Sequence, residues 1–284
     1  MLSATNARHA PLNLTPVDYR VLEACSIRGY RFLTCRQMAG LFFTSRPACK
    51  ERLEEMRRRR LVRRLFLPDT VNPWRSEAVF TLAGRGAKLL AEHRGGSQHF
   101  LARSSGRSYL FLRHSVRVSD FRLALEKALA VKGYRLLLWL NEWRIRDLNR
   151  TGRWPRLPRG SIIPDAIFSV ELDGRRENFM LEVDLGSAPL RRIRDKMLAY
   201  IRFFRQGLHG ELYGLPHFRV LIVSTTPSRV GRMLAILRDI GVCLNMFLTA
   251  PFPRGFGRQA PSPDIILQPI WRRCNEPEPF PLIV

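Results

Sequence analysis

The segment from Arg94 to Ser108 separates two parts of the chain, because it is rich in Gly, Ser and Arg and shows no apolar periodicity. That composition is typical of a linker or an exposed loop. With 284 residues, 45% of them apolar, the chain is long enough to bury a hydrophobic core on each side of the segment. The expected N-terminal domain, linker, second domain and proline-rich tail cover residues 1–95, 96–118, 119–250 and 251–284.

The first domain carries the signals of three helices, a β-hairpin and a closing helix. Thr15, Thr34 and Ser45 each occupy a helix-capping position, and apolar residues follow them at helical spacing. Two β-prone segments and a last helical segment come next, over Leu61–Leu67, Ala78–Leu82 and Gly84–Glu92. This order is that of a winged helix-turn-helix, in which the third helix enters the major groove of DNA and the hairpin wing contacts the backbone.

Basic side chains are concentrated on the third helix and on the hairpin. The third helix carries Cys49, Leu53 and Met56 on one stripe and basic residues on the opposite stripe. The predicted DNA-contact residues are Arg46, Lys50, Arg57, Arg58, Arg63, Arg64 and Arg75. The whole chain has 48 Lys and Arg against 24 Asp and Glu, a net charge of +24, which favours nucleic acid as the partner. A basic helix face that is merely solvated, or a winged domain that docks a protein, is the alternative.

The second domain alternates helices with strands. The expected order is helix Phe121–Val131, strands Leu136–Leu140, Ser161–Leu172 and Asn178–Asp184, helix Pro189–Phe204, strand Phe218–Ser224, helix Arg229–Asp239 and strand Val242–Leu248. Asp173-Gly174 is a strong hairpin turn signal between two of these strands. The pattern predicts a mixed α/β sheet. The tail holds eight of the 19 prolines and is expected to be extended.

Acidic side chains are predicted to meet at one end of this sheet. In the strand Asn178–Asp184 alternate side chains point to opposite faces, so that Glu182 and Asp184 project together. Antiparallel pairing through the Asp173-Gly174 turn brings Asp165 to the same end. Three carboxylates would repel one another unless a cation or a basic side chain lay among them, and oxygen ligands suit Mg²⁺ or Mn²⁺. The predicted chemistry is metal-dependent phosphodiester cleavage.

At these residues the chain resembles the PD-(D/E)xK nuclease superfamily. Pro164-Asp165 is followed one hairpin later by Glu182-Val183-Asp184, and then by a helix. The resemblance implies that Asp165 and Glu182 bind the metal ion and that the Val183 carbonyl assists. Asp184 stands where the superfamily usually has a lysine, two places after the glutamate.

Lys196 and Tyr200 on the next predicted helix complete the candidate catalytic set. They lie four residues apart, so both side chains can point back at the sheet, and the RecB-like branch of the superfamily carries a polar residue and a Tyr at this spacing. The resemblance implies that Lys196 supplies the missing cation. The candidate catalytic residues are Asp165, Glu182, Asp184, Lys196 and Tyr200. A partly buried ion network of Glu182, Asp184 and Lys196 that only stabilises the sheet is the alternative.

Over most of its length the chain is similar to the bacterial replication-relaxation family, which is associated with plasmid replication and mobilisation. The similar stretches are Leu14–Glu23, Phe80–Leu90, His114–Phe121, Glu142–Arg144 and, most specifically, Pro164–Tyr200. The resemblance implies an α+β protein: an N-terminal winged helix-turn-helix, followed by an α/β PD-(D/E)xK nuclease-like domain with a central mixed sheet.

Two functions fit this combination. The first is a DNA-binding protein of plasmid or mobile-element replication that also nicks DNA with Mg²⁺ or Mn²⁺. The second is a non-catalytic regulator or accessory factor. Its nuclease-like domain would bind DNA or recruit a relaxase, a replication initiator or another copy of the chain, as in a homodimer.

Other classes of site find no support in the sequence. The five cysteines form no C-x-x-C pair, which argues against zinc ribbons and a disulfide framework, and no two of the six histidines share ligand spacing. No glycine-rich loop precedes a helix, so no nucleotide or organic cofactor is expected. No apolar run approaches the roughly 20 residues of a spanning helix, and the start lacks a signal core. We therefore expect a cytoplasmic protein without a membrane partner.

Overall fold

The computed structural model describes residues 13–68, 76–96, 109–153, 155, 158, 161–241, 244–276 and 278–284. The chain divides into two compact units, unit 1 (Met1–Val116) and unit 2 (Arg117–Val284). The boundary between them falls inside a long helix, α5 (Tyr109–Lys132). Part of the expected linker is therefore helical, and residues 97–108 lie outside the described residues.

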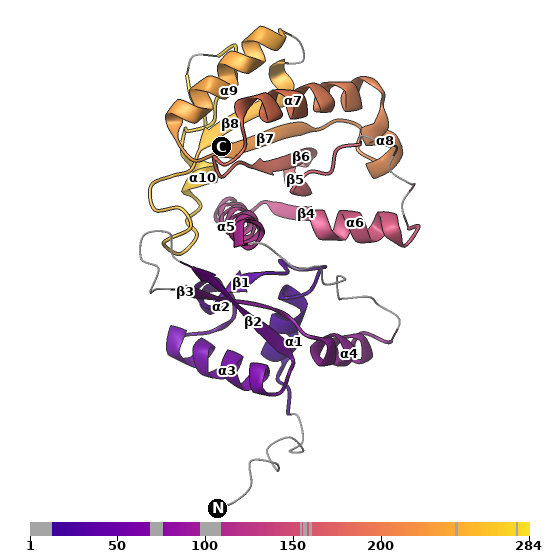
Figure 1. Ribbon diagram of the computed structural model, residues 1–284, viewed down its shortest axis with the longest axis vertical. Coiled ribbons are helices and arrows are strands. Elements are labelled where there is room, and N and C mark those ends of the chain that lie inside the picture. The colour runs from indigo at the N-terminus through magenta and orange to yellow at the C-terminus, as the bar shows by residue number, and fades with distance from the viewer. Residues whose placement is uncertain are drawn as a thin grey trace, which may run out of the picture. The chain divides into compact units, whose positions relative to one another are not determined.

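Unit 1 contains the helices and the hairpin that the sequence predicts, and one very short strand that it does not. Its elements are α1 (Pro16–Ala24), β1 (Leu33–Thr34), α2 (Cys35–Phe42), α3 (Arg46–Arg58), β2 (Val62–Pro68), β3 (Ser76–Leu82) and α4 (Gly84–His93). The strands form an antiparallel sheet in the order β1-β3-β2. Figure 1 labels all of these elements.

Local signals explain where the helices of unit 1 begin. Thr15, Thr34 and Ser45 each accept a hydrogen bond from a backbone N–H three residues further on, which satisfies a donor that a helix start leaves free. On α3, Cys49 and Leu53 are fully buried. The opposite, charged side of the same helix is therefore turned to solvent.

Unit 2 is built around a five-stranded mixed sheet. Its elements after α5 are β4 (Arg135–Asn141), α6 (Glu142–Arg150), β5 (Ala166–Leu172), β6 (Arg175–Val183), α7 (Leu190–Arg205), α8 (Leu208–Tyr213), β7 (Arg219–Ser224), α9 (Pro227–Ile240), a 3-10 turn (Leu244–Met246), β8 (Phe247–Pro251) and α10 (Asp264–Leu267). The strand order is β4-β5-β6-β7-β8. Strands β4, β5 and β6 are antiparallel, whereas β6, β7 and β8 run parallel.

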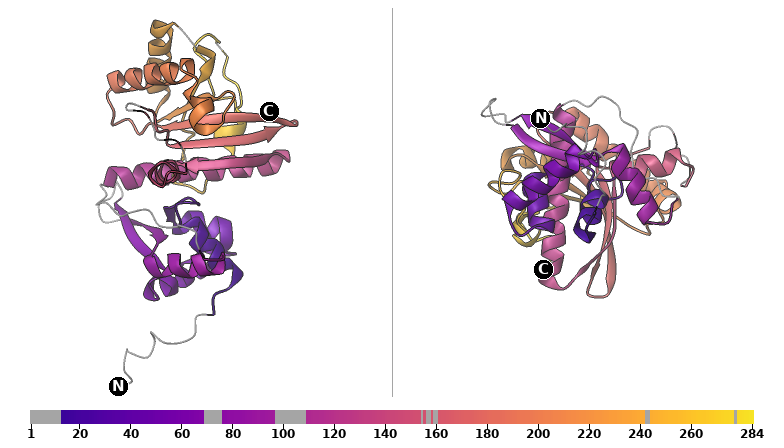
Figure 2. Two further views of the ribbon diagram at one scale, coloured as in Figure 1. Left: turned by 90° about the vertical axis from the view of Figure 1, so that its right-hand side faces the viewer. Right: turned by 90° about the horizontal axis from the view of Figure 1, so that it is seen from below.

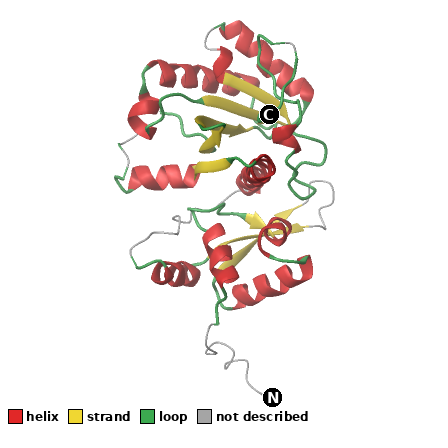
Figure 3. Cartoon of the chain, turned by 180° about the vertical axis from the view of Figure 1, so that it is seen from behind, coloured by secondary structure: helices red, strands yellow, loops and turns green. Residues whose placement is uncertain are grey.

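Helices cover both faces of this sheet, as Figures 2 and 3 show. On one face α7 and α9 pack on apolar side chains that include Met180 of β6 and Ile222 of β7. On the other face α5 packs on Leu181 and Val183 of β6. Because successive side chains of a strand alternate, Glu182 belongs to the face that α7 and α9 cover.

The structure corrects several predicted boundaries in unit 2. Helix α5 begins at Tyr109 rather than Phe121, and β5 begins at Ala166, directly after Pro164-Asp165. The last strand is β8, further along the chain than predicted, and residues 242–243 of the predicted strand lie outside the described residues. Helices α6 and α8 were not predicted. Helix α6 is short and mostly polar, with only Ile145 and Leu148 as buried apolar residues, so its periodicity is weak.

The expected extended tail is instead part of the core of unit 2. Ile265 and Ile266 of α10 are fully buried with Trp271, on the same face of the sheet as α5. The indole N–H of Trp271 donates to the Ile265 carbonyl at 2.6 Å. Prolines fix the course of the backbone but do not prevent neighbouring apolar side chains from packing. No helix in the described part of the chain is long and apolar enough to cross a membrane.

Candidate functional site

A buried carboxylate lies at the end of β6. Glu182 is only 7% exposed, and its two oxygen atoms accept hydrogen bonds from two side chains of α7, the Lys196 ammonium and the Tyr200 hydroxyl. The four-residue spacing on α7 directs both groups at the same strand, as the sequence predicts. Tyr200 is buried, whereas 43% of the Lys196 side chain is exposed. Part of the Lys196 side chain is therefore at the surface, while its ammonium group contacts the buried carboxylate.

Asp165 is held next to this group by the backbone of β6. Its Oδ2 accepts a hydrogen bond from the Val183 N–H at 2.7 Å, and its own N–H donates to the Leu181 carbonyl at 3.0 Å. The Asp165 carbonyl accepts from the N–H of Glu142, the first residue of α6. Asp165, Glu182, Lys196 and Tyr200, four of the five predicted catalytic residues, thus come together. We call these four residues the carboxylate cluster.

The groups of the carboxylate cluster perturb one another. The pKa of Glu182 is raised to about 7, against an ordinary value of 4.5; burial is the main cause, Lys196 opposes the rise and Asp165 contributes to it. Burial opposes the charge of Lys196, but Glu182, Asp165 and Glu142 outweigh it and raise the pKa of the ammonium. Burial, followed by Glu182, raises the pKa of Tyr200. The cluster therefore favours a positive charge among its carboxylates.

The raised pKa of Glu182 predicts a pH-dependent stability of the metal-free chain. Between about pH 4.5 and 7 the folded state holds a proton that the unfolded state has lost, so the free energy of unfolding falls as the pH rises. For a shift of this size the loss approaches about 3 kcal/mol. This pH dependence is measured by urea unfolding in EDTA, at pH 5 and at pH 8, for the wild type and for Glu182→Gln. Equal pH dependence in the two proteins would contradict the prediction.

Asp184, the fifth predicted catalytic residue, is engaged elsewhere. Its Oδ1 accepts from Nη2 of Arg229 on α9 at 3.0 Å, and its Oδ2 accepts from the Ser224 hydroxyl at 2.6 Å. Arg229 also donates to the Ala188 carbonyl at 2.6 Å. The Asp184 and Arg229 side chains are each 10% exposed. Asp184 thus forms a buried ion pair at the position where the nuclease superfamily that the sequence resembles usually has a lysine.

The carboxylate cluster offers two carboxylates, which suits an ion such as Mg²⁺ or Mn²⁺ that takes its other ligands from water and substrate. It does not suit a metal ion that is held by protein ligands alone. Among the described residues, no group of three or more His, Cys, Asp and Glu side chains is placed to hold a metal ion. Mg²⁺ commonly uses one or two carboxylates and completes its shell with water and phosphate oxygens. Asp165 and Glu182 are the two carboxylates of the cluster that could serve as such ligands.

The basic side chains of α3 and β2 form the second candidate site. Arg46, Lys50, Arg58 and Arg63 are exposed, and none of them pairs with an acidic side chain in the described part of the chain. Arg46 and Lys50 lie one helical turn apart on α3. Exposed cations that form no salt bridge with a carboxylate are suited to contacts with phosphate.

Two other predicted contact residues share one acidic partner. Arg57 pairs with Glu54 of the same helix, and Arg64 of β2 pairs with Glu54 at 3.0 Å. The hydrogen bond to Glu54 raises the pKa of Arg57. This triad connects the hairpin to α3. Arg75, the last predicted contact residue, lies outside the described residues.

The structure adds an aromatic residue that the sequence argument missed. Phe66 of β2 is 56% exposed, and the Arg64 guanidinium lies over its ring at 5.1 Å from the centroid. Arg64 and Phe66 are two residues apart on the strand, so they share the face of the hairpin that reaches Glu54 of α3. Phe66 stands in a run of β-prone residues, where sequence alone favours a core position.

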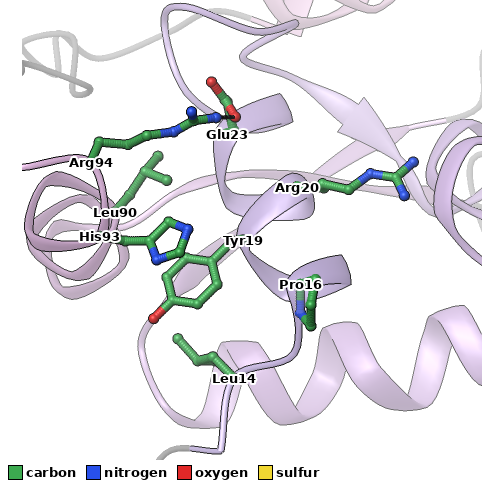
Figure 4. A pocket seen from close by; sticks show the side chains of 8 residues that line it. All are labelled: Leu14, Pro16, Tyr19, Arg20, Glu23, Leu90, His93 and Arg94. Atoms are coloured by element: carbon green, nitrogen blue, oxygen red, sulfur yellow. Dashed lines mark hydrogen bonds and ion pairs between the residues drawn. The ribbon is translucent and has the colours of Figure 1, made fainter.

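Unit 1 also contains a pocket of about 450 Å³ between α1 and α4 (Figure 4). The Tyr19 ring stacks on His93 with the ring centroids 3.8 Å apart, and Arg94 donates to Glu23 at 2.5 Å. The remaining lining residues are Leu14, Pro16, Arg20 and Leu90. None of the predicted DNA-contact residues lines this pocket, which is therefore distinct from the basic surface.

Together these features define a chain with a helical N-terminal unit that contains a small antiparallel sheet, followed by a mixed-sheet unit in which a lysine and a tyrosine contact a buried glutamate. Residues 25–216 match the Replication-relaxation family, and the chain belongs to that family. The match includes α3 and the whole carboxylate cluster and ends before β7. Membership confirms the resemblance seen in the sequence and suggests a role in replication or relaxation. No curated protein and no solved structure matches the chain.

Proposed function

We propose that the chain binds duplex DNA through a winged-helix surface on unit 1 and nicks it at the carboxylate cluster of unit 2, in plasmid or mobile-element replication. Family membership supports the biological setting. The observation that carries the proposal is the contact of buried Glu182 with Lys196 and Tyr200 beside Asp165. An acid of this kind is costly to bury without a function or a compensating partner.

The cluster has the parts that phosphodiester cleavage needs. Asp165 and Glu182 would hold Mg²⁺ or Mn²⁺, which when bound supplies an activated water and stabilises the charge on the phosphate. Lys196 is exposed enough to contact a phosphate oxygen and to neutralise the negative charge that develops there. Tyr200 donates to Glu182 and keeps its carboxyl group oriented.

The test is nicking of supercoiled plasmid, preferably one that encodes the protein. We expect relaxed circles with Mg²⁺ or Mn²⁺, none with EDTA, and none with Asp165→Ala. Asp173→Ala is the matched control, because Asp173 is an acid in the exposed turn of the same hairpin. Nicking that persists in Asp165→Ala would remove this residue from the mechanism.

A second function has an observation in its favour. Both oxygens of Glu182 are occupied by Lys196 and Tyr200, and both oxygens of Asp184 are occupied as well, so the acids form satisfied networks without a metal ion. This arrangement suits a non-catalytic accessory factor that recruits a relaxase, an initiator or another copy of the chain. DNA binding without nicking on the cognate plasmid would favour this function instead.

The basic surface of α3 gives a prediction for DNA affinity. Replacing Arg46 and Lys50 together by Ala removes two exposed cations, and we expect about tenfold weaker binding at moderate salt. The slope of log affinity against log salt concentration should fall by about two, since about two fewer counterions are released. Fluorescence anisotropy with a labelled duplex at several salt concentrations measures both quantities.

The matched control is the double substitution of Arg85 and Lys88, which removes the same charge from the exposed side of α4. It should leave the salt slope close to that of the wild type. An equal loss in both double variants would mean that affinity follows the net charge of the chain and not the α3 surface.

A further inference from the structure

Two cysteines of unit 1 lie in contact where the first residue of α2 meets α3. The Sγ atoms of Cys35 and Cys49 are 3.7 Å apart, and the Cys49 thiol lies 3.6 Å from the Cys35 carbonyl oxygen. Cys35 is the first residue of α2 and is partly exposed, whereas Cys49 of α3 is completely buried. A disulfide needs a sulfur separation of about 2.05 Å, so an approach of about 1.7 Å would join them.

The surroundings distinguish Cys35 from the other described cysteines. The pKa of Cys35 is lowered to about 7; the hydrogen bond with Cys49 is the main cause, burial opposes the change, and Arg46 and Lys50 contribute to it. The start of α2 also favours a negative charge. The hydrogen bond with Cys35 is the main cause that raises the pKa of Cys49, and burial adds to it. Burial alone raises the pKa of Cys25 to about 12. A partly exposed thiol with a lowered pKa therefore lies beside a buried thiol with a raised pKa.

We propose that Cys35 and Cys49 are a peroxide-reactive dithiol site, with Cys35 as the nucleophile and Cys49 as the resolving thiol. The Cys35 thiolate attacks a hydroperoxide, breaks its O–O bond and becomes a sulfenic acid, while hydroxide or alkoxide leaves and takes a proton. The Cys49 sulfur then attacks the Cys35 sulfur, and the sulfenic hydroxyl leaves with the Cys49 proton as water. Two thiols are oxidised to one disulfide, and the peroxide is reduced to water or to water and an alcohol.

The disulfide would act on the helix that carries the basic surface. Cys49 lies between Arg46 and Lys50 in the sequence of α3, so movement of its sulfur toward α2 displaces the backbone that positions both cations. Oxidation is therefore expected to weaken DNA binding several-fold. This consequence, unlike the sulfur chemistry, rests on the proposed function.

The test treats the reduced full chain with hydrogen peroxide, and uses intact mass and a non-reducing peptide map as readouts. We expect a chain lighter by two hydrogen atoms with Cys35 linked to Cys49. Cys49→Ser should instead accumulate a sulfenic acid on Cys35 that dimedone traps, and Cys35→Ser should form neither product. Arg46→Gln should slow the alkylation of Cys35 near neutral pH and move its pH midpoint upward, an effect that a purely structural cysteine would not show.

Cys25→Ser and Cys274→Ser are the matched controls and should react like the wild type. The proposal fails if the folded chain, checked by circular dichroism, keeps both thiols under peroxide or links Cys35 to another cysteine. DNA affinity of the oxidised and reduced chains is measured in parallel, with Cys35→Ser as the variant that cannot form the bond. If the disulfide forms but the reduced chain does not bind DNA, the dithiol site stands and the proposed function does not.

Discussion

Glu182→Gln is expected to lower the rate of metal-dependent nicking by about 1,000-fold, which corresponds to about 4 kcal/mol of transition-state stabilisation. The amide keeps the shape of the side chain but removes the negative charge that would hold a divalent cation with Asp165. Lys196 keeps a carbonyl oxygen of the new amide as a hydrogen-bond acceptor and has Asp165 beside it as a counter-charge. The loss should therefore appear in catalysis and not in folding.

Single-turnover nicking of supercoiled plasmid, with saturating protein and Mn²⁺, measures this loss. The affinity of the variant for DNA should differ from that of the wild type by less than twofold. Glu171→Gln is the matched control, because it makes the same chemical change on the neighbouring strand β5. There Glu171 pairs with the exposed Arg135. Nicking by Glu182→Gln at more than a tenth of the wild-type rate would exclude this carboxylate as a metal ligand.

Most of the fold follows from periodicity and capping. The three N-terminal helices, the hairpin and the placement of alternate β6 side chains on opposite faces of the sheet are local properties of the sequence, and the structure confirms them. The start of α5 was missed because Arg113, His114 and Arg117 interrupt its apolar pattern, although Leu112 and Val116 pack on Phe32, Leu67 and Val79 of unit 1. The tail was misjudged because its burial depends on a sheet face formed by distant segments.

In the candidate site too, contacts between residues close in sequence were predicted and a contact with a distant segment was missed. Asp165, Glu182, Lys196 and Tyr200 are related by one hairpin and one helical turn, so spacing alone brings them together. Asp184 shares the side of β6 predicted for it, but its partner Arg229 comes from α9, 45 residues away. No spacing rule connects those two residues, and sequence reasoning therefore assigned Asp184 to the catalytic set.

This placement of Asp184 leads to a second large expected effect, on stability. Asp184→Ala should lower the free energy of unfolding by about 3 to 5 kcal/mol, because it leaves a buried guanidinium without a counter-charge. The Ala188 carbonyl would still accept a hydrogen bond from Arg229, but a neutral acceptor does not replace an anion at 10% exposure. Thermal and urea unfolding of both proteins measure the difference.

Asp239→Ala is the matched control for this substitution. Asp239 pairs with Arg194 at 3.1 Å between α9 and α7, but its side chain is 69% exposed and that of Arg194 is 45% exposed. Solvent screens such a pair, and its loss should cost less than about 1 kcal/mol. In the double variant Asp184→Ala with Arg229→Met, stability should largely return, because no buried charge is left unpaired. If Asp184→Ala instead folds as stably as the wild type yet cannot nick DNA, Asp184 belongs to the catalytic set after all.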